Sequence, residues 1–114
     1  NIMKEIFNYT IKEPSFTLVK NGIKKVEGRL FKNTFCNIKT NDIILFRNSN
    51  RYIKTQVVKV TWYKNFYEML LNEGIKNVTP LSDNIDDSLS IYRKIYRQDN
   101  ENKYGVIAIH LKID

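Results

Sequence analysis

Hydrophobic and polar residues alternate in the middle of the chain in a way that predicts a long β-strand. Within residues 51–63, Ile53 and Val57 fall on one face of an extended chain, and Lys54 and Gln56 fall on the other. A two-residue period of this kind is typical of a strand with one buried face. We therefore predict that this segment is the longest strand of the protein.

Four shorter segments also have the β-branched and aromatic composition of strands. Turn residues at 40–42 and 48–50 separate two of the predicted strands from their neighbours, and the second turn has the composition of a hairpin. A continuous apolar run near the end of the chain indicates a buried final strand. The predicted short strands are residues 3–11, 24–30, 43–46 and 106–109.

Three segments follow the spacing of a helix instead. An early proline and an Asn-Gly stop predict a helix of about two turns within residues 13–22. A second helix is predicted over residues 65–74, where the terminal glycine is a typical stop. A third is predicted over residues 86–96, with acidic residues near its start and basic residues near its end, as the helix dipole favours. The charged residues 98–103 are predicted to form a loop.

The order of these elements predicts an α+β fold. The strands follow one another as hairpins rather than as regular strand-helix-strand repeats, and no glycine-rich phosphate-binding motif is present. We expect a small, curved antiparallel β-barrel flanked by two or three short helices. A length of 114 residues predicts a single domain over residues 1–114.

Composition and charge narrow the range of partners. The chain has 19 Lys and Arg against 12 Asp and Glu, a net charge of +7, which favours an RNA or nucleotide partner. The alternative is a lysine-rich composition without functional meaning, and charge alone does not decide between the two. A single cysteine, Cys36, and the lack of a long apolar run or signal peptide predict a protein of the cytoplasm or nucleus, neither secreted nor membrane-bound. We also expect a monomer. We expect no metal and no cofactor.

The densest mixture of basic and aromatic residues lies near the C-terminus. RNA-binding surfaces commonly combine these two residue types, because cations contact phosphates and aromatic rings stack on bases. The alternative is a helix whose tyrosines pack inward and whose cations are only solvated. The candidate binding residues of this segment are Tyr92, Arg93, Arg97, Lys103 and Tyr104.

The stretch KKVEGRL, residues 24–30, places charges on a predicted strand. Side chains alternate across a strand, so Lys24 and Glu27 point to opposite faces unless a bulge forms at Gly28 or the strand begins after Lys24. Burying these charges singly would be costly, so Lys24, Glu27 and Arg29 are expected to pair with one another or to face a ligand. The alternative is an edge strand that its charges keep soluble.

Four stretches of the chain resemble, in order, the ASCH (activating signal cointegrator homology) domains: VKNGIKKVEGRL, IKTNDIILF, KVTWYKNFYEMLLNEG and YRKIYRQDNENKYGVIAIHL. The resemblance covers nearly the whole chain and implies a barrel related to the PUA RNA-binding module. Asn41 stands where the family commonly has a glycine before Asp42. A left-handed turn, which Asn also adopts, is therefore expected there.

The resemblance also implies a role for the charged strand. In ASCH domains the positions of Lys24, Glu27 and Arg29 line a cleft inside the barrel mouth. The resemblance thus implies that RNA or a modified nucleotide binds in a basic cleft, with Lys25 as a more peripheral candidate.

An enzymatic alternative follows from the same resemblance. Some bacterial ASCH proteins resemble small amidohydrolases that remove the acetyl group of N4-acetylcytidine with a lysine, a threonine and a glutamate. Lys24 matches the lysine, Glu27 replaces the threonine, and Glu73 is the candidate glutamate, or else a solvated residue of a last helical turn. Because Glu27 stands in place of the threonine of this catalytic set, we favour nucleotide or RNA binding over amidohydrolase or ribonuclease activity. His110 has no visible Ser or Cys partner and receives no catalytic role.

Overall fold

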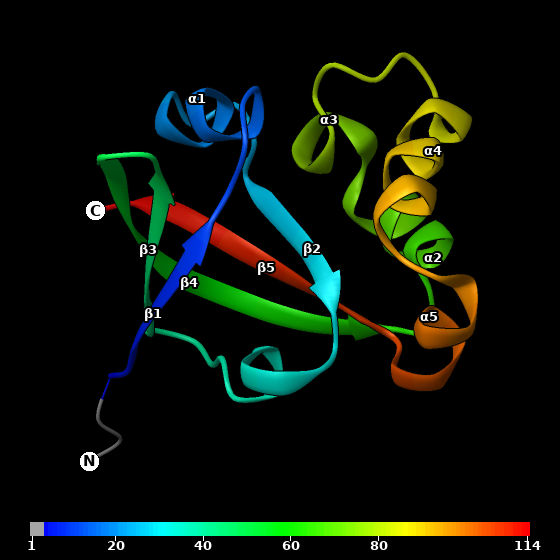
Figure 1. The fold of residues 1–114 in the computed structure, drawn as a ribbon, viewed down its shortest axis with the longest axis horizontal. Coiled ribbons are helices and arrows are strands. Elements are labelled where there is room, and N and C mark those ends of the chain that lie inside the picture. Colours follow the sequence, from blue (N-terminus) through cyan, green and yellow to red (C-terminus); the bar gives the residue numbers. More distant parts are fainter. Residues whose placement is uncertain (1–3) are drawn as a thin grey trace.

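The computed structural model describes residues 4–114, which form one five-stranded sheet with helices around it (Figure 1). Met3, the first residue of the predicted opening strand, lies outside this range. In chain order the elements are β1 (Ile6–Thr10), α1 (Ser15–Lys20), β2 (Val26–Leu30), the 3-10 helix η1 (Asn33–Cys36), β3 (Ile43–Asn48), β4 (Arg51–Tyr63), α2 (Phe66–Glu73), α3 (Ile75–Val78), α4 (Ile85–Ile95), α5 (Gln98–Tyr104) and β5 (Val106–Ile113).

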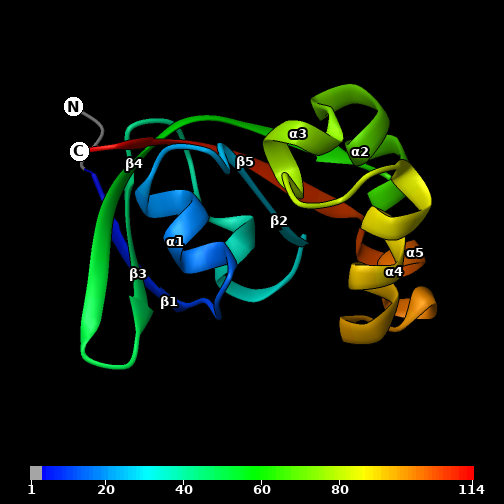
Figure 2. The same ribbon diagram turned by 90° about the horizontal axis from the view of Figure 1, so that it is seen from above.

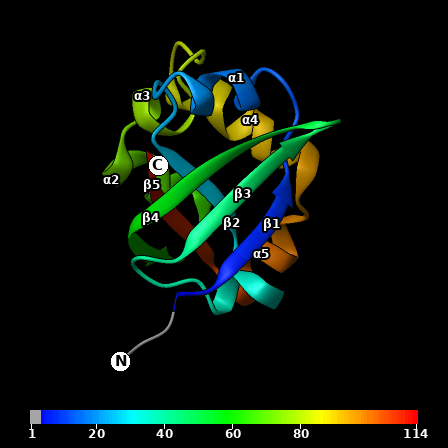
Figure 3. The same cartoon turned by 90° about the vertical axis from the view of Figure 1, so that its left-hand side faces the viewer.

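The sheet has the strand order β1-β3-β4-β5-β2 and curls into a half-barrel, which confirms the α+β class and the curved sheet. Figure 3 shows β4, β3 and β1 side by side along one flank. The pair β1 and β3 is parallel, whereas the other neighbours are antiparallel. The expectation of a purely antiparallel sheet is wrong for this pair, because α1 and β2 intervene between β1 and β3 and carry the chain back to its starting end.

The concave face of the sheet holds one of two apolar cores. Alternate residues of the strands point inward, as the two-residue period predicts, and α1 closes over them in the mouth of the curve (Figure 2). Phe16 and Val19 on α1 are almost fully buried in this core. Its buried members on the strands are Ile44, Phe46, Ile53, Val57, Ile107, Ile109 and Leu111.

The second core lies on the opposite face, beneath the helices α2, α3 and α4. Val26 and Leu30 of β2 pack there against Phe66 and Met69 of α2. The rings of Phe66 and Tyr92 stack with centroids 4.1 Å apart. Because this core takes the even-numbered residues of β2, the odd-numbered residues of that strand face the concave side.

Local sequence signals set most of the element boundaries. The helices predicted over residues 13–22, 65–74 and 86–96 are present as α1, α2 and α4, and side-chain oxygens of Asn65 and Asn84 cap the last two. Asn41 has φ of 78°, so the expected left-handed turn is confirmed.

The prediction of a loop at residues 98–103 is wrong, because the segment forms α5. This helix lacks an apolar stripe, and a buried acid attaches it to the rest of the protein. The Glu101 carboxylate, 1% exposed, accepts hydrogen bonds from the Phe66 amide at 2.7 Å and from Arg93 Nη1 at 2.6 Å. One side chain thus joins α5 to the start of α2 and to α4.

Replacing Glu101 with alanine is expected to destabilise the protein strongly. The change leaves the Phe66 amide and the Arg93 guanidinium without their acceptor, and breaking a buried charged pair costs about 3 kcal/mol or more. Urea denaturation followed by circular dichroism measures the loss. Asp99→Ala is the matched control on the same helix, because Asp99 pairs with Arg97 in solvent, and it should leave the midpoint nearly unchanged. Equal effects of the two variants would contradict the role of Glu101.

Candidate functional site

A cavity of about 440 Å³ opens between the end of β1, the edge strand β2 and the helical side of the molecule. The lining comes from four stretches of the chain: residues 10–18, from the end of β1 into α1; residues 24–29, at and before β2; residues 78–82, from the end of α3 into the following loop; and residues 91–96, at the end of α4. Apolar side chains form much of the wall, and charged side chains of β2 form the floor. The apolar wall residues are Ile11, Pro14, Leu18, Val78, Pro80, Leu81, Ile91 and Ile95.

The charged floor is a chain of three side chains centred on Glu27. Its Oε1 lies 3.2 Å from Lys24 Nζ, and its Oε2 accepts from Arg29 Nη2 at 2.9 Å and from Arg29 Nε at 3.1 Å. Lys24 reaches Glu27 because β2 begins only at Val26, so the strict alternation of a strand does not apply to Lys24. The expected mutual pairing of the three side chains is confirmed, without a bulge at Gly28.

Lys24 is a bridge between β2 and α3 as well as a partner of Glu27. Its Nζ also donates to the carbonyl oxygens of Val26, at 2.8 Å, and Val78, at 2.5 Å. An ammonium group has three N–H donors, and three protein acceptors occupy them here. With a residue exposure of 5%, Lys24 is therefore a structural part of the cavity floor.

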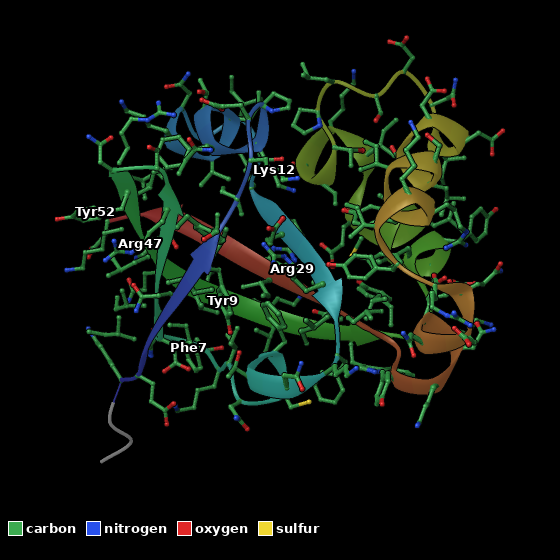
Figure 4. All side chains as sticks on the ribbon, viewed as in Figure 1. Phe7, Tyr9, Lys12, Arg29, Arg47 and Tyr52 are labelled. Atoms are coloured by element: carbon green, nitrogen blue, oxygen red, sulfur yellow. The ribbon has the colours of Figure 1, made fainter. Side chains whose placement is uncertain are left out.

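Arg29 is the cation of the floor that remains accessible, with a side chain 20% exposed. Its guanidinium lies 5.7 Å from the ring centre of Tyr9 and 5.2 Å from that of Phe35. Figure 4 shows Arg29 and Tyr9 extending toward one another between β2 and β1, with Lys12 farther along at the cavity rim. Nη1 of Arg29 makes no bond to Glu27, so it has N–H groups to offer to a ligand.

The electrostatics of the floor fix the protonation of the groups around it. Burial raises the pKa of the Glu27 carboxyl, but the charges and hydrogen bonds of Lys24 and Arg29 outweigh burial and hold this pKa below its ordinary value. Burial raises the pKa of the Tyr92 and Tyr96 hydroxyls, and the nearby Glu27 charge adds to the rise. Both phenols in the cavity wall thus keep their protons at neutral pH and can donate a hydrogen bond to a ligand.

Most of the basic and aromatic C-terminal candidates lie outside the cavity. Tyr92 lines it, whereas Arg93 pairs with Glu101 and Arg97 pairs with Asp99. Lys103 lies over the ring of Tyr104, with Nζ 5.2 Å from its centre. Lys25 is exposed and does not line the cavity; its amide donates to the Asn77 carbonyl at 2.9 Å.

Glu73 belongs to a different cluster, away from the cavity lining. Its Oε2 accepts from the Tyr63 hydroxyl at 2.6 Å, and its Oε1 lies 2.7 Å from His110 Nε2. The side chain of Glu73 is only 8% exposed, so the alternative of a solvated residue is wrong. Burial and the neighbouring Glu73 raise the pKa of Tyr63 to about 12. The structure therefore brings Lys24 and Glu27 together but does not bring Glu73 to them.

Two parts of the cavity wall carry no clear signal in the sequence. Ile95, the last residue of α4, and Tyr96, which follows it, both line the cavity, and Ile95 is 63% exposed. The loop after α3, with Thr79 and Leu81, carries no motif. The excess of apolar residues on α4 could have indicated this wall, because the helix also has Ile91 exposed beside the cavity.

The fold is a small half-barrel with a cleft between its edge strand and its helices, and this fold defines the class of the protein. Comparison with known protein families identifies the family. The ASCH domain family model matches residues 10–113, so the chain belongs to the ASCH family. Within residues 4–114, no helix has the length and apolarity needed to span a membrane. The same range contains no group of three or more His, Cys, Asp or Glu side chains arranged to hold a metal ion.

Two solved structures share this fold and much of the sequence. The crystal structure of the hypothetical protein PH0355 has a TM-score of 0.90 and 37% identity, with 96% of this chain and 99% of that chain covered. The solution NMR structure of protein PF0455 from Pyrococcus furiosus has a TM-score of 0.80 and 34% identity, with 95% and 96% covered. No curated protein matches the chain.

Replacing Glu27 with glutamine should reduce stability in a pH-dependent way. The folded protein holds the Glu27 pKa below the ordinary value of 4.5, so the ionised carboxylate stabilises the fold fully above that pH. This contribution is lost as the pH falls through the lower, folded-state pKa. At pH 7 the variant should lose about 2 kcal/mol of unfolding free energy, because the buried Lys24 and the half-buried Arg29 lose their counter-charge.

The difference between wild type and Glu27→Gln should shrink progressively in urea titrations below about pH 4.5. Lys25→Ala is the control, because Lys25 is exposed and lies outside the charged floor. A difference that stays constant from pH 7 to pH 3 would contradict the ionised pairing.

Proposed function

We propose that the cavity binds one unpaired nucleotide, either free or as part of a single-stranded RNA. The observation that carries this proposal is the combination of an apolar wall with a charged, hydrogen-bonding floor in one cavity of about 440 Å³. This volume lies in the range of small-ligand sites, which are commonly apolar with a few polar groups that orient the ligand. A nucleobase has the matching form, with apolar faces and polar edges.

The polar groups around the cavity suit the edges and the phosphate of such a ligand. Arg29 offers N–H donors from the floor, and hydroxyl donors come from Tyr92 on α4 and from Tyr96 just after it. Lys12, exposed at the rim, can neutralise a phosphate group outside the cavity. Sequence-specific recognition of RNA commonly targets unpaired bases that leave the stack and enter pockets of this kind.

The arrangement supports binding better than amide hydrolysis. Three protein acceptors already bond the Lys24 ammonium group, and Glu73 pairs with Tyr63 and His110 outside the cavity lining. Of the residues that match the N4-acetylcytidine amidohydrolases, Lys24 is therefore already bonded within the protein, and Glu73 is not in the cavity lining. Cytidine release from N4-acetylcytidine remains the direct test of the enzymatic alternative.

Arg29→Met is expected to weaken nucleotide binding at least tenfold, because it removes the accessible donor of the floor. The measurement is isothermal titration with the four nucleoside 5′-monophosphates and with single-stranded RNA octamers, at fixed salt. Arg97→Met is the matched control, since it removes the same charge outside the cavity, where Arg97 pairs with Asp99. Thermal melts of both variants verify that they are folded.

The affinity for the RNA octamers should also depend on the salt concentration. Phosphates outside the cavity release counterions on contact with the basic surface, so octamer affinity should fall as salt rises, more steeply than monophosphate affinity. Equal losses in Arg29→Met and Arg97→Met would mean that binding follows net charge rather than the cavity. Lack of binding by every monophosphate and octamer, or steady turnover of N4-acetylcytidine, would refute the proposal.

A further inference from the structure

The edge strand β2 presents part of its main chain to the cavity. β2 pairs with β5 on one side only and ends the sheet on the other. The Leu111 amide donates to the Lys25 carbonyl at 2.9 Å, and the Phe31 amide donates to the Gly105 carbonyl at 3.0 Å. Both contacts belong to hydrogen-bonded pairs of the antiparallel ladder.

Hydrogen-bonded and non-bonded pairs alternate along an antiparallel ladder. With residues 25 and 31 in the bonded set, the residues between them at odd positions bond to β5. The residues at even positions, Val26, Gly28 and Leu30, direct their N–H and C=O groups to the free edge.

Two of the three free-edge carbonyls are occupied from within the protein. Lys24 Nζ donates to the Val26 carbonyl at 2.8 Å, and the Lys32 amide donates to the Leu30 carbonyl at 2.9 Å. Gly28, between them, is buried and lines the cavity, and within residues 4–114 its carbonyl receives no hydrogen bond. A buried carbonyl without a partner is costly, so a ligand group that donates to it would be favoured.

The surroundings of Gly28 direct this free edge toward the cavity. On the helical side the strand is tightly packed, because a Cβ at Gly28 would lie 2.8 Å from Met69 Sδ and 3.2 Å from the Tyr92 hydroxyl. On the concave side, Glu27 and Arg29 are locked to each other. The main chain of Gly28 is thus a fixed donor and acceptor pair between a packed helical face and a charged floor.

We propose that the N–H and C=O of Gly28 pair with the Watson–Crick edge of the bound base. This inference rests on the nucleotide-binding function proposed above. Each common base carries a donor next to an acceptor on that edge, and one extended residue presents the complementary N–H and C=O to the same side. The pairing is analogous to the addition of a strand to a sheet edge, where main-chain hydrogen bonds supply affinity. The edge must then be unpaired, so the site accepts single-stranded nucleotides and excludes duplexes.

Nuclear magnetic resonance of the ¹⁵N-labelled protein tests this pairing directly. The probes are the four nucleoside 5′-monophosphates, a single-stranded RNA octamer of mixed sequence, and the monophosphates of 1-methyladenosine, 1-methylguanosine, 3-methylcytidine and 3-methyluridine. The Gly28 amide proton should shift downfield at saturation, whereas the Arg29 amide, which bonds to β5, should move much less. A methyl group on the edge should weaken binding at least tenfold.

The monophosphates of 5-methylcytidine and 5-methyluridine are matched controls, because their methyl groups lie away from the Watson–Crick edge. They should bind within about threefold of the parent compounds. If resonances around the cavity saturate while Gly28 stays unmoved and the edge-methylated compounds bind equally well, this pairing is wrong and the nucleotide-binding function stands. If no cavity resonance moves with any monophosphate or with the octamer, both proposals are wrong.

Discussion

The pairing of one buried carboxylate with two cations is the interaction on which the cavity depends. Glu27 on β2 would be costly to bury alone, and Lys24 and Arg29 compensate its charge from either side. Because Lys24 must reach Glu27 from the same face, the strand begins after it, at Val26. The same ammonium group bonds the Val78 carbonyl and so joins α3 to the sheet. One ionic cluster therefore sets the start of β2, the floor of the cavity and the position of its helical wall.

The two faces of β2 and its free main-chain edge have different roles. Its even-numbered side chains, such as Val26 and Leu30, anchor the second core beneath α2 and α4. Its odd-numbered side chains, Glu27 and Arg29, form the charged floor on the concave side. Its free main-chain edge is occupied at both ends and open at Gly28. A glycine suits that position because the helices approach too closely for a Cβ.

Local patterns predicted the parts of the protein that local physics determines. The period of β4 and the caps and dipole of α4 are encoded within a few residues, and the pairing of Glu27 followed from the cost of burying charges close together on a strand. The parallel pairing of β1 with β3 and the docking of α5 through Glu101 depend on residues far apart in the chain. The Glu73 and His110 pair has the same long-range origin. The exposed Ile91 and Ile95 of α4 line the cavity, and no local pattern distinguishes such wall positions from the core positions of the same helix.

A double-mutant cycle between Lys24 and Glu27 tests the central claim most directly. The free energies of unfolding of wild type, Lys24→Met, Glu27→Gln and the double variant would be measured by urea denaturation at pH 7. The account predicts that the double variant loses less than the sum of the two single losses, by about 1.5 kcal/mol or more, because each single change leaves a buried charge without its partner. Additive losses, within about 0.5 kcal/mol, would contradict the coupling that is proposed to build the cavity.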